Sequence, residues 1–520
     1  MDATRSTFPW WKEAVFYQIY PRSFAGTTGS GVGDLAGVLS RLDYLCRLGI
    51  DAIWLSPFYP SPMHDFGYDV ADYCDVDPIF GSMKDAEELI EAVHDRGMRI
   101  IIDWVPGHTS LLHPWFVEAR SSRTSPRRDW YIWRDPSDDG GCPNNWIAAF
   151  GNVPAWTFDE GSGQYYLHSF LAEQPDLNWS NPEVREAMHG VLRFWLDRGV
   201  DGFRADVVHN IGKDSALADV GDARKNLPRF LLNEEAATHG YLREVRSLLD
   251  GYPGERMMVG EVVLFSIDQM SSYYGQEDEL HLVFNFRSLY TPWEAREWGD
   301  CIADTTRSLA KLGAWPAWAM SNHDLPRQRT RFGSEACARA AALMLLTLRG
   351  TPFLYMGEEL GLEDAEVPQD RRLDPGGRDG CRAPIPWNGG PLAGWPTDPW
   401  LPFPPDADKR NAAEQSPDQT SMLSHYRALL RARRGSVALR RGSMRRIDAP
   451  GGVLAYQRMA AADSRTILIN FSGDSIDCEV IPEGCIEVAS DGARETGARF
   501  DGRLGPYEAL LLRPLNPRSP

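Results

Sequence analysis

Three acidic residues each follow a strand-like segment of the sequence. Asp206 ends GVDGFRAD, Glu261 ends MMVGE, and Asp324 ends SNHD. Side chains at the carboxyl ends of parallel strands meet at one end of a barrel, so we expect these three carboxyls to converge. A pair of carboxyls, one ionised and one protonated, breaks glycosidic bonds in retaining glycoside hydrolases. Singly, each acid is typical of a salt-bridge partner; together, the three indicate a site for chemistry on a sugar.

The surroundings of two of these acids favour different protonation states. Arg204 lies two residues before Asp206, on the same face of the strand, where a guanidinium can hold the carboxylate ionised and oriented. Glu261 lies between MMVG and VVLF, an apolar environment that raises a carboxyl pKa. These neighbours favour an ionised Asp206 and a protonated Glu261.

Eight strand-like segments must position these residues. Short aliphatic segments alternate with longer amphipathic ones, and the apolar spacing from Leu35 to Leu45 predicts one helix after the first strand. Eight strands with intervening helices predict an α/β fold, a (β/α)8 TIM barrel, with a doubly wound open sheet as the alternative. The eight segments are 15–20, 53–55, 99–105, 199–206, 256–260, 280–285, 315–321 and 351–355.

Two parts of the chain depart from this alternation. Residues 106–176 lack a helical period and are rich in aromatic residues that need a packing partner, so we expect an inserted subdomain after the third strand. Beyond about residue 436 the apolar period changes to two, which predicts a C-terminal antiparallel β-domain. The predicted domains are the barrel's first part (1–105), inserted subdomain B (106–176), the barrel's second part (177–435) and a C-terminal β-sandwich domain (436–520).

The composition excludes several classes of partner. The 520 residues include 54 Lys and Arg against 73 Asp and Glu, a net charge of −19, which disfavours nucleic acids and anionic membranes. No apolar stretch approaches the roughly 20 residues of a membrane span, and the first residues do not resemble a signal peptide. Eight cysteines without a C-x-x-C pair are typical of reduced thiols. We expect a cytoplasmic protein, monomer or homodimer; a small oligosaccharide as its partner is implied by the acidic site and the family motifs, not by the composition.

Several long motifs occur in a fixed order along the chain. They begin at Trp10 (WWKEAVFYQIYPRSF), Trp54 (WLSPFYPSPMHDFGYDVADY), Asp103 (DWVPGHTS), Gly202 (GFRADVV), Gly260 (GE), Ser321 (SNHD), Gly350 (GTPFLYMGEELG) and Gly377 (GRDGCRAPIPW). Together they resemble the α-amylase superfamily, glycoside hydrolase family 13, and within it the α-glucosidase and oligo-1,6-glucosidase branch. The resemblance covers nearly the whole chain.

The resemblance implies catalytic roles for the three acids. Asp206 matches the nucleophile that forms a covalent glucosyl-enzyme, and Glu261 matches the general acid/base. Asp324 matches a third acid that binds sugar hydroxyls and helps to distort the ring. The residues that match groups lining the same subsite are Arg204, His108 and His323.

Four more positions match residues that surround the substrate. Tyr68 and Asp69 match a stacking ring and a carboxylate that grip the terminal glucose. Arg382 matches an arginine that pairs with that carboxylate and closes the pocket. Phe150 matches an aromatic residue near the cleaved bond. The resemblance thus implies a dead-end pocket for one non-reducing glucose.

The chain departs from the family pattern where many relatives hold calcium. The pattern D-x-N-G-D-G-x-G-D is reduced to Asp34 in the aligned stretch 26–34, and Gly107 replaces an Asn that is a metal ligand in calcium-dependent amylases. One carboxylate does not replace the hydration shell of a divalent ion. We therefore predict no metal at this loop and no cofactor.

Two positions give conflicting indications of linkage. Val207, after the nucleophile, is typical of α-1,6-acting relatives, whereas IPW at 385–387 is more similar to the PMPW of α-1,4-specific ones. The phrase GFRADVVHNIGKD also resembles α-glucosidases of broader specificity. Linkage preference stays open.

The function implied is that of a retaining, exo-acting α-glucosidase on short α-glucosides: maltose and maltooligosaccharides, with isomaltose, trehalose and sucrose as further candidates. The alternative is a transglucosidase or isomerase, such as trehalose synthase or sucrose isomerase, which shares the three acids. How well the acceptor side excludes water distinguishes these two, and this depends on loops near 262–290 and 358–382. A non-catalytic scaffold is disfavoured because all three acids are present.

Overall fold

A closed barrel forms the centre of the molecule. The computed structural model describes residues 8–233, 235–478 and 483–515. Eight parallel strands follow the order β10-β11-β1-β2-β3-β7-β8-β9, and a parallel bridge between Phe284 and Ala317 joins the two ends of the sheet. This is the predicted (β/α)8 barrel and not an open sheet. The strands are β1 (Phe16–Ile19), β2 (Ala52–Leu55), β3 (Arg99–Trp104), β7 (Gly202–Ala205), β8 (Met257–Gly260), β9 (Leu282–Val283), β10 (Ala317–Ala319) and β11 (Thr351–Tyr355).

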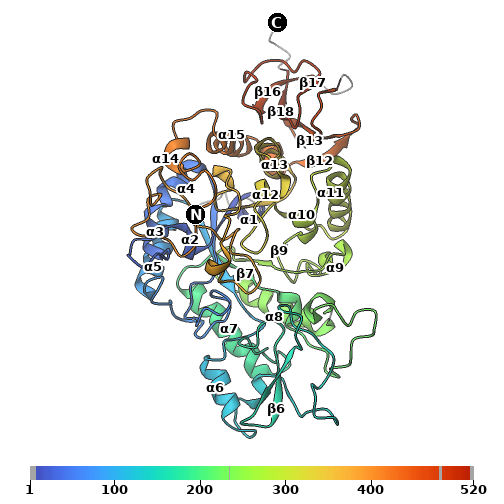
Figure 1. The fold of residues 1–520 in the computed structure, drawn as a ribbon. Helices are drawn as coiled ribbons and strands as arrows, with labels where there is room; N and C mark the ends of the chain where they lie inside the picture. The colour runs from blue at the N-terminus through green and yellow to red at the C-terminus, as the bar shows by residue number, and fades with distance from the viewer. Residues whose placement is uncertain (1–7, 234, 479–482, 516–520) are drawn as a thin grey trace.

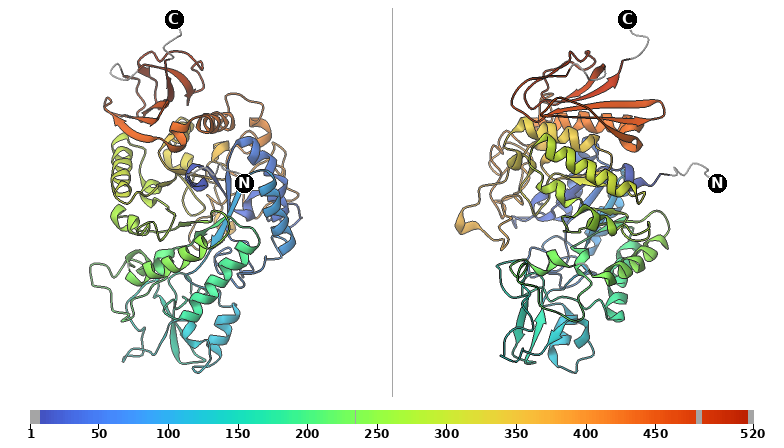
Figure 2. Two further views of the ribbon diagram at one scale, coloured as in Figure 1. Left: turned by 180° about the vertical axis from the view of Figure 1, so that it is seen from behind. Right: turned by 90° about the vertical axis from the view of Figure 1, so that its right-hand side faces the viewer.

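Helices surround the barrel (Figures 1 and 2). The longer ones are α5 (Met83–Asp95), α7 (Pro182–Asp197), α8 (Ala236–Asp250), α11 (Ala295–Ala310), α13 (Glu335–Thr347) and α15 (Met422–Gly435). The shorter ones are α1 (Trp10–Glu13), α2 (Pro21–Phe24), α3 (Leu35–Ser40), α4 (Leu42–Leu48), α9 (Ile267–Ser272), α10 (Phe286–Tyr290), α12 (Gln328–Phe332), α14 (Ala412–Gln415) and α16 (Val437–Arg441). Among the described residues, 3-10 turns lie at η1 (Arg128–Trp130), η2 (Val208–Asn210), η3 (Arg229–Leu232), η4 (Glu358–Leu360) and η5 (Gln369–Arg371).

The prediction of one helix from Leu35 to Leu45 is wrong, because the segment forms two helices, α3 and α4. Arg41 separates them with φ −108° and ψ 3°, outside the helical region, and its N–H bonds back to Val38 and Leu39. The apolar spacing was the same on both sides of this break, so the sequence pattern did not reveal it.

Alternate side chains of the barrel strands form two apolar layers. Phe16, Ala52 and Ile101 belong to a cluster in the barrel interior. Their neighbours Tyr17 and Ile53 belong to the larger cluster that packs the helices on the outside. This period of two places one face of each strand inside the barrel and the other beneath the helices.

The inserted subdomain and the C-terminal domain lie at opposite ends of the molecule (Figures 1 and 2). Between β3 and α7, the insertion contains α6 (Pro114–Ser121) and an antiparallel sheet of β4 (Trp133–Arg134), β6 (Gln164–Leu167) and β5 (Trp156–Asp159). Its aromatic residues find partners within it: the Phe116 ring packs on Tyr131, Trp133 and Tyr166.

The C-terminal domain is antiparallel, as predicted. One sheet has the order β12-β13-β14-β18-β16, and its edge strand β12 is largely exposed. The strands are β12 (Ser443–Ile447), β13 (Val453–Ala460), β14 (Asp463–Asn470), β16 (Gly484–Ala489) and β18 (Ala509–Pro514), and a second sheet pairs β15 (Ile476–Asp477) with β17 (Arg503–Leu504). Among the described helices, none is long and apolar enough to cross a membrane.

Candidate active site

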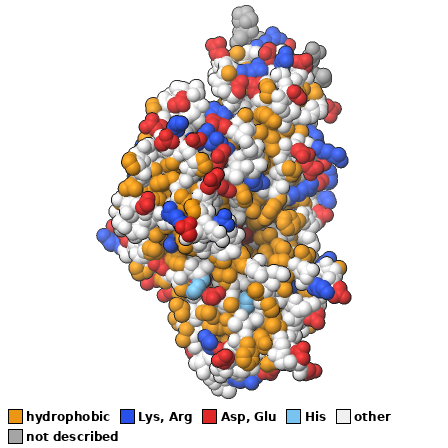
Figure 3. Space-filling view, in the orientation of Figure 1, with side chains coloured by type: hydrophobic (Ala, Val, Ile, Leu, Met, Phe, Trp, Pro, Cys, Tyr) orange, Lys and Arg blue, Asp and Glu red, His pale blue; other side chains and the backbone are white. Residues whose placement is uncertain are grey.

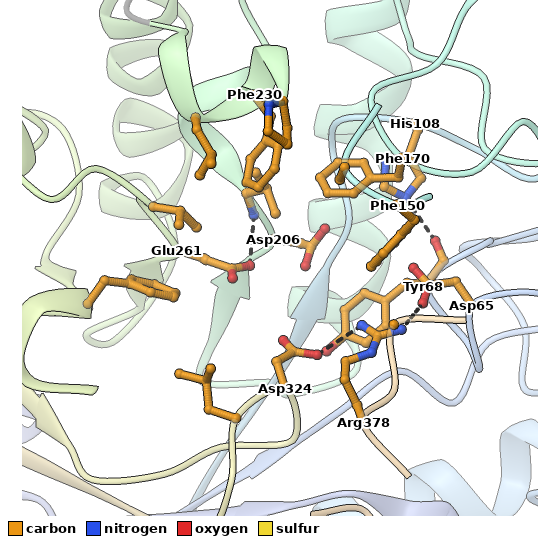
Figure 4. Close-up of a pocket in the computed structure, with 18 of the residues that line it drawn as sticks. Asp65, Tyr68, His108, Phe150, Phe170, Asp206, Phe230, Glu261, Asp324 and Arg378 are labelled. Carbon is orange, nitrogen blue, oxygen red and sulfur yellow. Dashed lines mark hydrogen bonds and ion pairs between the residues drawn. The ribbon is translucent and has the colours of Figure 1, made fainter. Parts of the chain in front are cut away.

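The three acids predicted from the sequence line one cavity of about 390 Å³ at the carboxyl end of the barrel (Figure 4). Hydrogen bonds just beyond the strand ends fix two of them. The N–H of Asp206 donates to Trp104 O at 2.8 Å, and the N–H of Glu261 donates to Ala205 O at 2.9 Å. The parallel pairing of β3 with β7 and of β7 with β8 therefore continues for one residue and brings both carboxyls to the same place.

The side chain of Arg204 bonds to both Asp206 and Glu261. It pairs in register with Asp103 of the neighbouring strand β3, and its side chain is 2% exposed. Nη1 donates to Asp103 at 2.5 Å and to Asp206 at 2.6 Å, while Nη2 donates to Glu261 at 2.5 Å. Arg204 thus bonds Asp206, as its position in the sequence suggests, and it shares the same charge with Asp103 and Glu261.

The positive charge of Arg204 does not hold the pKa values of Asp206 and Glu261 at their usual level, because both carboxyls are buried. Burial raises the pKa of Glu261 to about 8 against the opposing effect of Arg204, and the nearby Asp206 raises it further. Burial likewise raises the pKa of Asp206 to about 7, again against Arg204. Of these two carboxyls, Glu261 thus keeps its proton to higher pH, and Asp206 ionises at the lower pH.

Val207 holds Glu261 through its backbone. Its N–H donates to Glu261 Oε2 at 3.1 Å. The residue has φ +35°, in the left-handed region that a β-branched residue rarely adopts. Strain of this kind is typical of functional sites, where surrounding contacts enforce it.

Asp324 lies in a more cationic environment than the other two acids. Its Oδ1 accepts from Arg378 Nη1 and from Arg382 Nη2, both at 3.0 Å, and its Oδ2 lies 3.3 Å from His323 Nε2. Burial alone would raise the pKa of Asp324, but His323, Arg378 and Arg382 outweigh burial and hold it well below its usual range. Asp324 is therefore the acid that stays ionised.

Asp65 and Arg378 close the polar end of the cavity. Arg378 Nη2 donates to Asp65 Oδ1 at 2.5 Å, and Gln174 Nε2 donates to Asp65 Oδ2 at 3.0 Å. Tyr68, whose Oη lies 2.6 Å from His323 Nε2, lines the cavity beside them. In Figure 4, Asp65, Tyr68 and Arg378 lie on one side of Asp206, and Glu261 lies on the other.

The predicted pair between Asp69 and Arg382 is not formed. Asp69 is fully buried outside the cavity lining, where it accepts hydrogen bonds from Ser61 Oγ and from the N–H groups of His64 and Asp65. Arg382 is also fully buried and pairs with Asp324 and Asp374 instead. Asp69 organises the loop that presents Asp65, and the pair that closes the pocket is Asp65–Arg378.

The other predicted site residues divide between the lining and the support. His108 and Phe150 line the cavity, and the Arg378 guanidinium lies 5.2 Å from the centre of the Phe150 ring. His323 is buried behind Tyr68, where burial lowers its pKa to about 3 despite the raising effect of Asp324. His323 is therefore a neutral hydrogen-bonding group at neutral pH.

An apolar wall completes the cavity. The segment near 262–290, expected at the acceptor side, supplies four of its side chains, but no motif singled out any of them. The members lie on loops, on η3 and on α10, where no periodic pattern marks them. They are Phe170, Phe230, Leu231, Val263, Phe265, Phe286, Tyr290 and Leu325.

The loop that aligns with calcium sites does not fit a metal ion. Asp34 Oδ1 accepts from the N–H of Gly37 at 2.6 Å as the N-cap of α3, and Oδ2 accepts from the N–H and Oγ1 of Thr27. Both oxygens are thus used within the protein. Within residues 8–233, 235–478 and 483–515, no group of three or more His, Cys, Asp or Glu side chains has the geometry to hold a metal.

The chain is similar to known proteins over most of its length. Residues 18–442 match the family model described as the alpha amylase catalytic domain. A probable alpha-glucosidase of Rhizobium meliloti (strain 1021) is 40% identical, and the alignment covers 91% of each chain. An oligo-1,6-glucosidase of Halalkalibacterium halodurans is 38% identical, covering 96% of this chain and 98% of the relative. The crystal structure of the alpha-glucosyl transfer enzyme XgtA superposes with a TM-score of 0.91 at 39% identity, covering 98% of this chain and 100% of that one.

Proposed function

The chain belongs to the alpha-amylase family, a family of glycoside hydrolases, and on that premise we propose that it is a retaining α-glucosidase acting on short α-glucosides. The observation that supports this most directly is the single guanidinium of Arg204 that bonds both Asp206 and Glu261. It holds the two carboxyls close together, as a double-displacement mechanism requires.

In the first step, Asp206 attacks C1 of the terminal glucose while Glu261 gives its proton to the glycosidic oxygen. The C1–oxygen bond breaks, the leaving sugar departs as a neutral alcohol, and an ester forms between C1 and Asp206. The order of the two pKa values supports this assignment, since Glu261 keeps its proton at a pH at which Asp206 is becoming ionised.

In the second step, the roles of Glu261 reverse. The ionised carboxylate takes a proton from water, the water oxygen attacks C1, and the ester to Asp206 breaks. α-Glucose is released, Asp206 is again a carboxylate, and Glu261 is again protonated. The chemistry uses no metal, in keeping with a calcium-type loop whose one carboxylate is already bonded.

The closed polar end of the cavity supports cleavage at the non-reducing end of a sugar chain. Asp65, Arg378 and the ionised Asp324 offer charged hydrogen-bonding groups to the hydroxyls of one glucose. The Asp65–Arg378 pair blocks the path beyond that glucose, which suits the non-reducing end of a short chain rather than the middle of a polymer.

Transfer of glucose to another sugar is the alternative outcome of the same covalent intermediate. The similarity to an alpha-glucosyl transfer enzyme favours keeping it as a second candidate. Both candidates share the first step, so the partition between water and an acceptor decides between them.

Product analysis by proton NMR separates these outcomes. The purified protein, with chelator present, is incubated separately with maltose, isomaltose, trehalose and sucrose, and the first anomer released is identified. Free α-glucose supports the retaining glucosidase, and its rate from each disaccharide gives the linkage preference. New disaccharides with little free glucose would instead identify a transferase or isomerase.

The matched control is Asp206→Asn, which removes the nucleophile with little change of shape. We expect it to abolish turnover of every substrate that the wild-type protein cleaves. A variant that still released α-glucose at the wild-type rate would contradict the assignment of Asp206.

A further inference from the structure

The cavity is divided into a polar half and an apolar half. Its charged groups lie at the end closed by Asp65 and Arg378 and at the three acids. Beyond Glu261, the lining side chains are almost entirely hydrocarbon: Phe230, Leu231, Val263, Phe265, Phe286, Tyr290 and Leu325. The space-filling view shows hydrophobic side chains beside the hollow near the centre of this face (Figure 3).

Phe265 and Tyr290 form an exposed aromatic pair in this apolar half. Phe265 is 54% exposed and Tyr290 is 52% exposed, although both line the cavity. Their rings meet edge to face, with centroids 5.4 Å apart and planes at 62°. Phe265 lies four residues after Glu261 in the same loop, and Tyr290 ends α10. Two large aromatic side chains, each about half exposed, thus line the cavity that holds the general acid.

The phenol of Tyr290 also lies near the reacting groups. Burial raises its pKa, and the negative charges of Asp324 and Glu261 raise it further. Tyr290, Glu261 and Asp324 also line the same cavity. Phe265 follows Glu261 closely in the chain, and the Asp65–Arg378 pair lies on the other side of Asp206, so we place the aromatic pair on the side to which the leaving group departs.

This surface offers a second sugar few hydrogen-bond partners, so the sugar's hydroxyls must keep the hydrogen bonds that they make with water. A polar group that is buried without a partner is destabilising. Of the lining side chains that the structure describes beyond Glu261, only Tyr290 carries a polar atom. An alkyl chain or an aromatic ring would cover the pair without leaving a polar group unpaired.

Building on the proposed glucosidase function, we propose that Phe265 and Tyr290 form an apolar aglycone subsite that binds the hydrocarbon part of alkyl and aryl α-glucosides. The chemistry is unchanged. Asp206 forms the ester to C1, the C1–oxygen bond breaks, and Glu261 protonates the departing alcohol. The subsite contributes binding of the alcohol's hydrocarbon part on the far side of that bond.

A series of n-alkyl α-glucosides from methyl to hexyl tests this subsite. The leaving alcohols beyond methanol have nearly constant acidity, so a change in kcat/KM along the series reports contact with the chain. Burial of each CH2 is worth about 0.8 kcal/mol, so full burial gives about a fourfold rise per carbon and half burial about a twofold rise. We expect a rise of about two- to fourfold per carbon over at least the first few carbons.

Two variants assign the rise to the aromatic pair. Phe265→Ser and Tyr290→Ser should each flatten the slope of log kcat/KM against chain length. Phe158→Ser is the matched control, because Phe158 is 44% exposed and packs on Tyr165 with centroids 5.1 Å apart, in the inserted sheet outside the cavity lining. It should keep the wild-type slope.

The outcomes distinguish the subsite from the reaction itself. Turnover of maltose together with a flat alkyl series would overturn the apolar subsite and leave the glucosidase in place. A steep series that neither serine variant flattens would also overturn it, because the contact would then lie elsewhere. No turnover of maltose or of any alkyl glucoside would contradict the proposed glucosidase, and the subsite with it.

Discussion

Arg378 and Asp65 form an ion pair across the closed end of the cavity, with 2.5 Å between Nη2 and Oδ1. The two residues lie 313 positions apart in the chain, on loops that follow different barrel strands. Because the same guanidinium also bonds Asp324 and Asp374, it connects the wall of the pocket to the third acid. The closed end of the pocket and the third acid therefore share one cation.

Asp65→Asn removes the charge opposite Arg378 with little change in shape. Truncating one partner of a buried, hydrogen-bonded charge pair costs about 2 to 5 kcal/mol in binding, so we expect kcat/KM for maltose to fall at least about 30-fold. The measurement is steady-state kinetics of the folded variant, with the thermal midpoint recorded in parallel.

Asp69→Asn is the control, because this carboxylate accepts two backbone N–H groups and a serine hydroxyl away from the cavity. It should lower the thermal midpoint more than Asp65→Asn and reduce kcat/KM less. A larger kinetic loss in the Asp69 variant than in the Asp65 variant would restore the original assignment of Asp69.

The sequence located the right motifs at this end of the pocket but the wrong side chains. Asp65 and Asp69 lie in one motif, and Arg378 and Arg382 in another, each pair four residues apart. Phe66 and Gly67 have φ +48° and +112°, so the backbone turns sharply between Asp65 and Tyr68. Which carboxylate faces the cavity depends on this turn, and residue spacing alone does not specify it.

The three acids were easier to predict, because each follows a barrel strand and a strand's direction fixes where its end lies. Asp206 and Glu261 even continue the backbone hydrogen bonds of the sheet. Phe265 and Tyr290 had no such signal: the first lies in a loop after β8 and the second ends the five-residue helix α10. Whether the two rings contact each other depends on how the loop after β8 packs against α10.

The pH dependence of kcat/KM should be bell-shaped, with its maximum between the two raised pKa values. Activity falls as the pH drops through about 7, because the nucleophile Asp206 becomes protonated. It falls again as the pH rises through about 8, because Glu261 loses the proton that it must donate. The two limbs belong to the coupled pair and are measured with maltose.

α-Glucosyl fluoride provides the control for this profile. Fluoride leaves without a proton from the enzyme, so the alkaline limb of kcat/KM should flatten while the acid limb stays. An alkaline limb that is identical with both substrates would exclude Glu261 as its source.

Chelation should change neither the stability nor the activity of the protein, whereas loss of the Asp34 side chain should lower the stability. We expect equal thermal midpoints and equal activity with chelator and with added calcium, because both Asp34 oxygens already accept hydrogen bonds from the protein. Asp34→Ala removes the N-cap of α3, which costs about 1 kcal/mol of folding free energy. A rise in thermal midpoint with added calcium, lost in Asp34→Ala, would instead demonstrate a metal site.

Arg204→Gln should shift both limbs of the pH profile to higher pH. Arg204 lowers the pKa of Asp206 and of Glu261 against the effect of burial, so its removal raises both. Loss of a positioned donor in an active site typically lowers kcat about 100- to 1,000-fold, and a fall of that order is expected here. Arg204→Lys keeps the charge and should restore the limb positions more fully than the rate, because an ammonium does not span two carboxyls as a guanidinium does.

Arg433→Gln is the matched control for Arg204→Gln. Arg433 is 1% exposed, close to the 2% of Arg204, but among the described residues its guanidinium donates to backbone carbonyls, those of Leu346, Leu439 and Gly350. Its loss should lower the thermal midpoint. The protein that remains folded should keep both limbs of the pH profile at the wild-type pH values. Limb positions do not depend on how much protein is folded, so the comparison separates electrostatic control of the acids from stability. Unchanged limbs in Arg204→Gln would show that this cation does not set the protonation of Asp206 and Glu261.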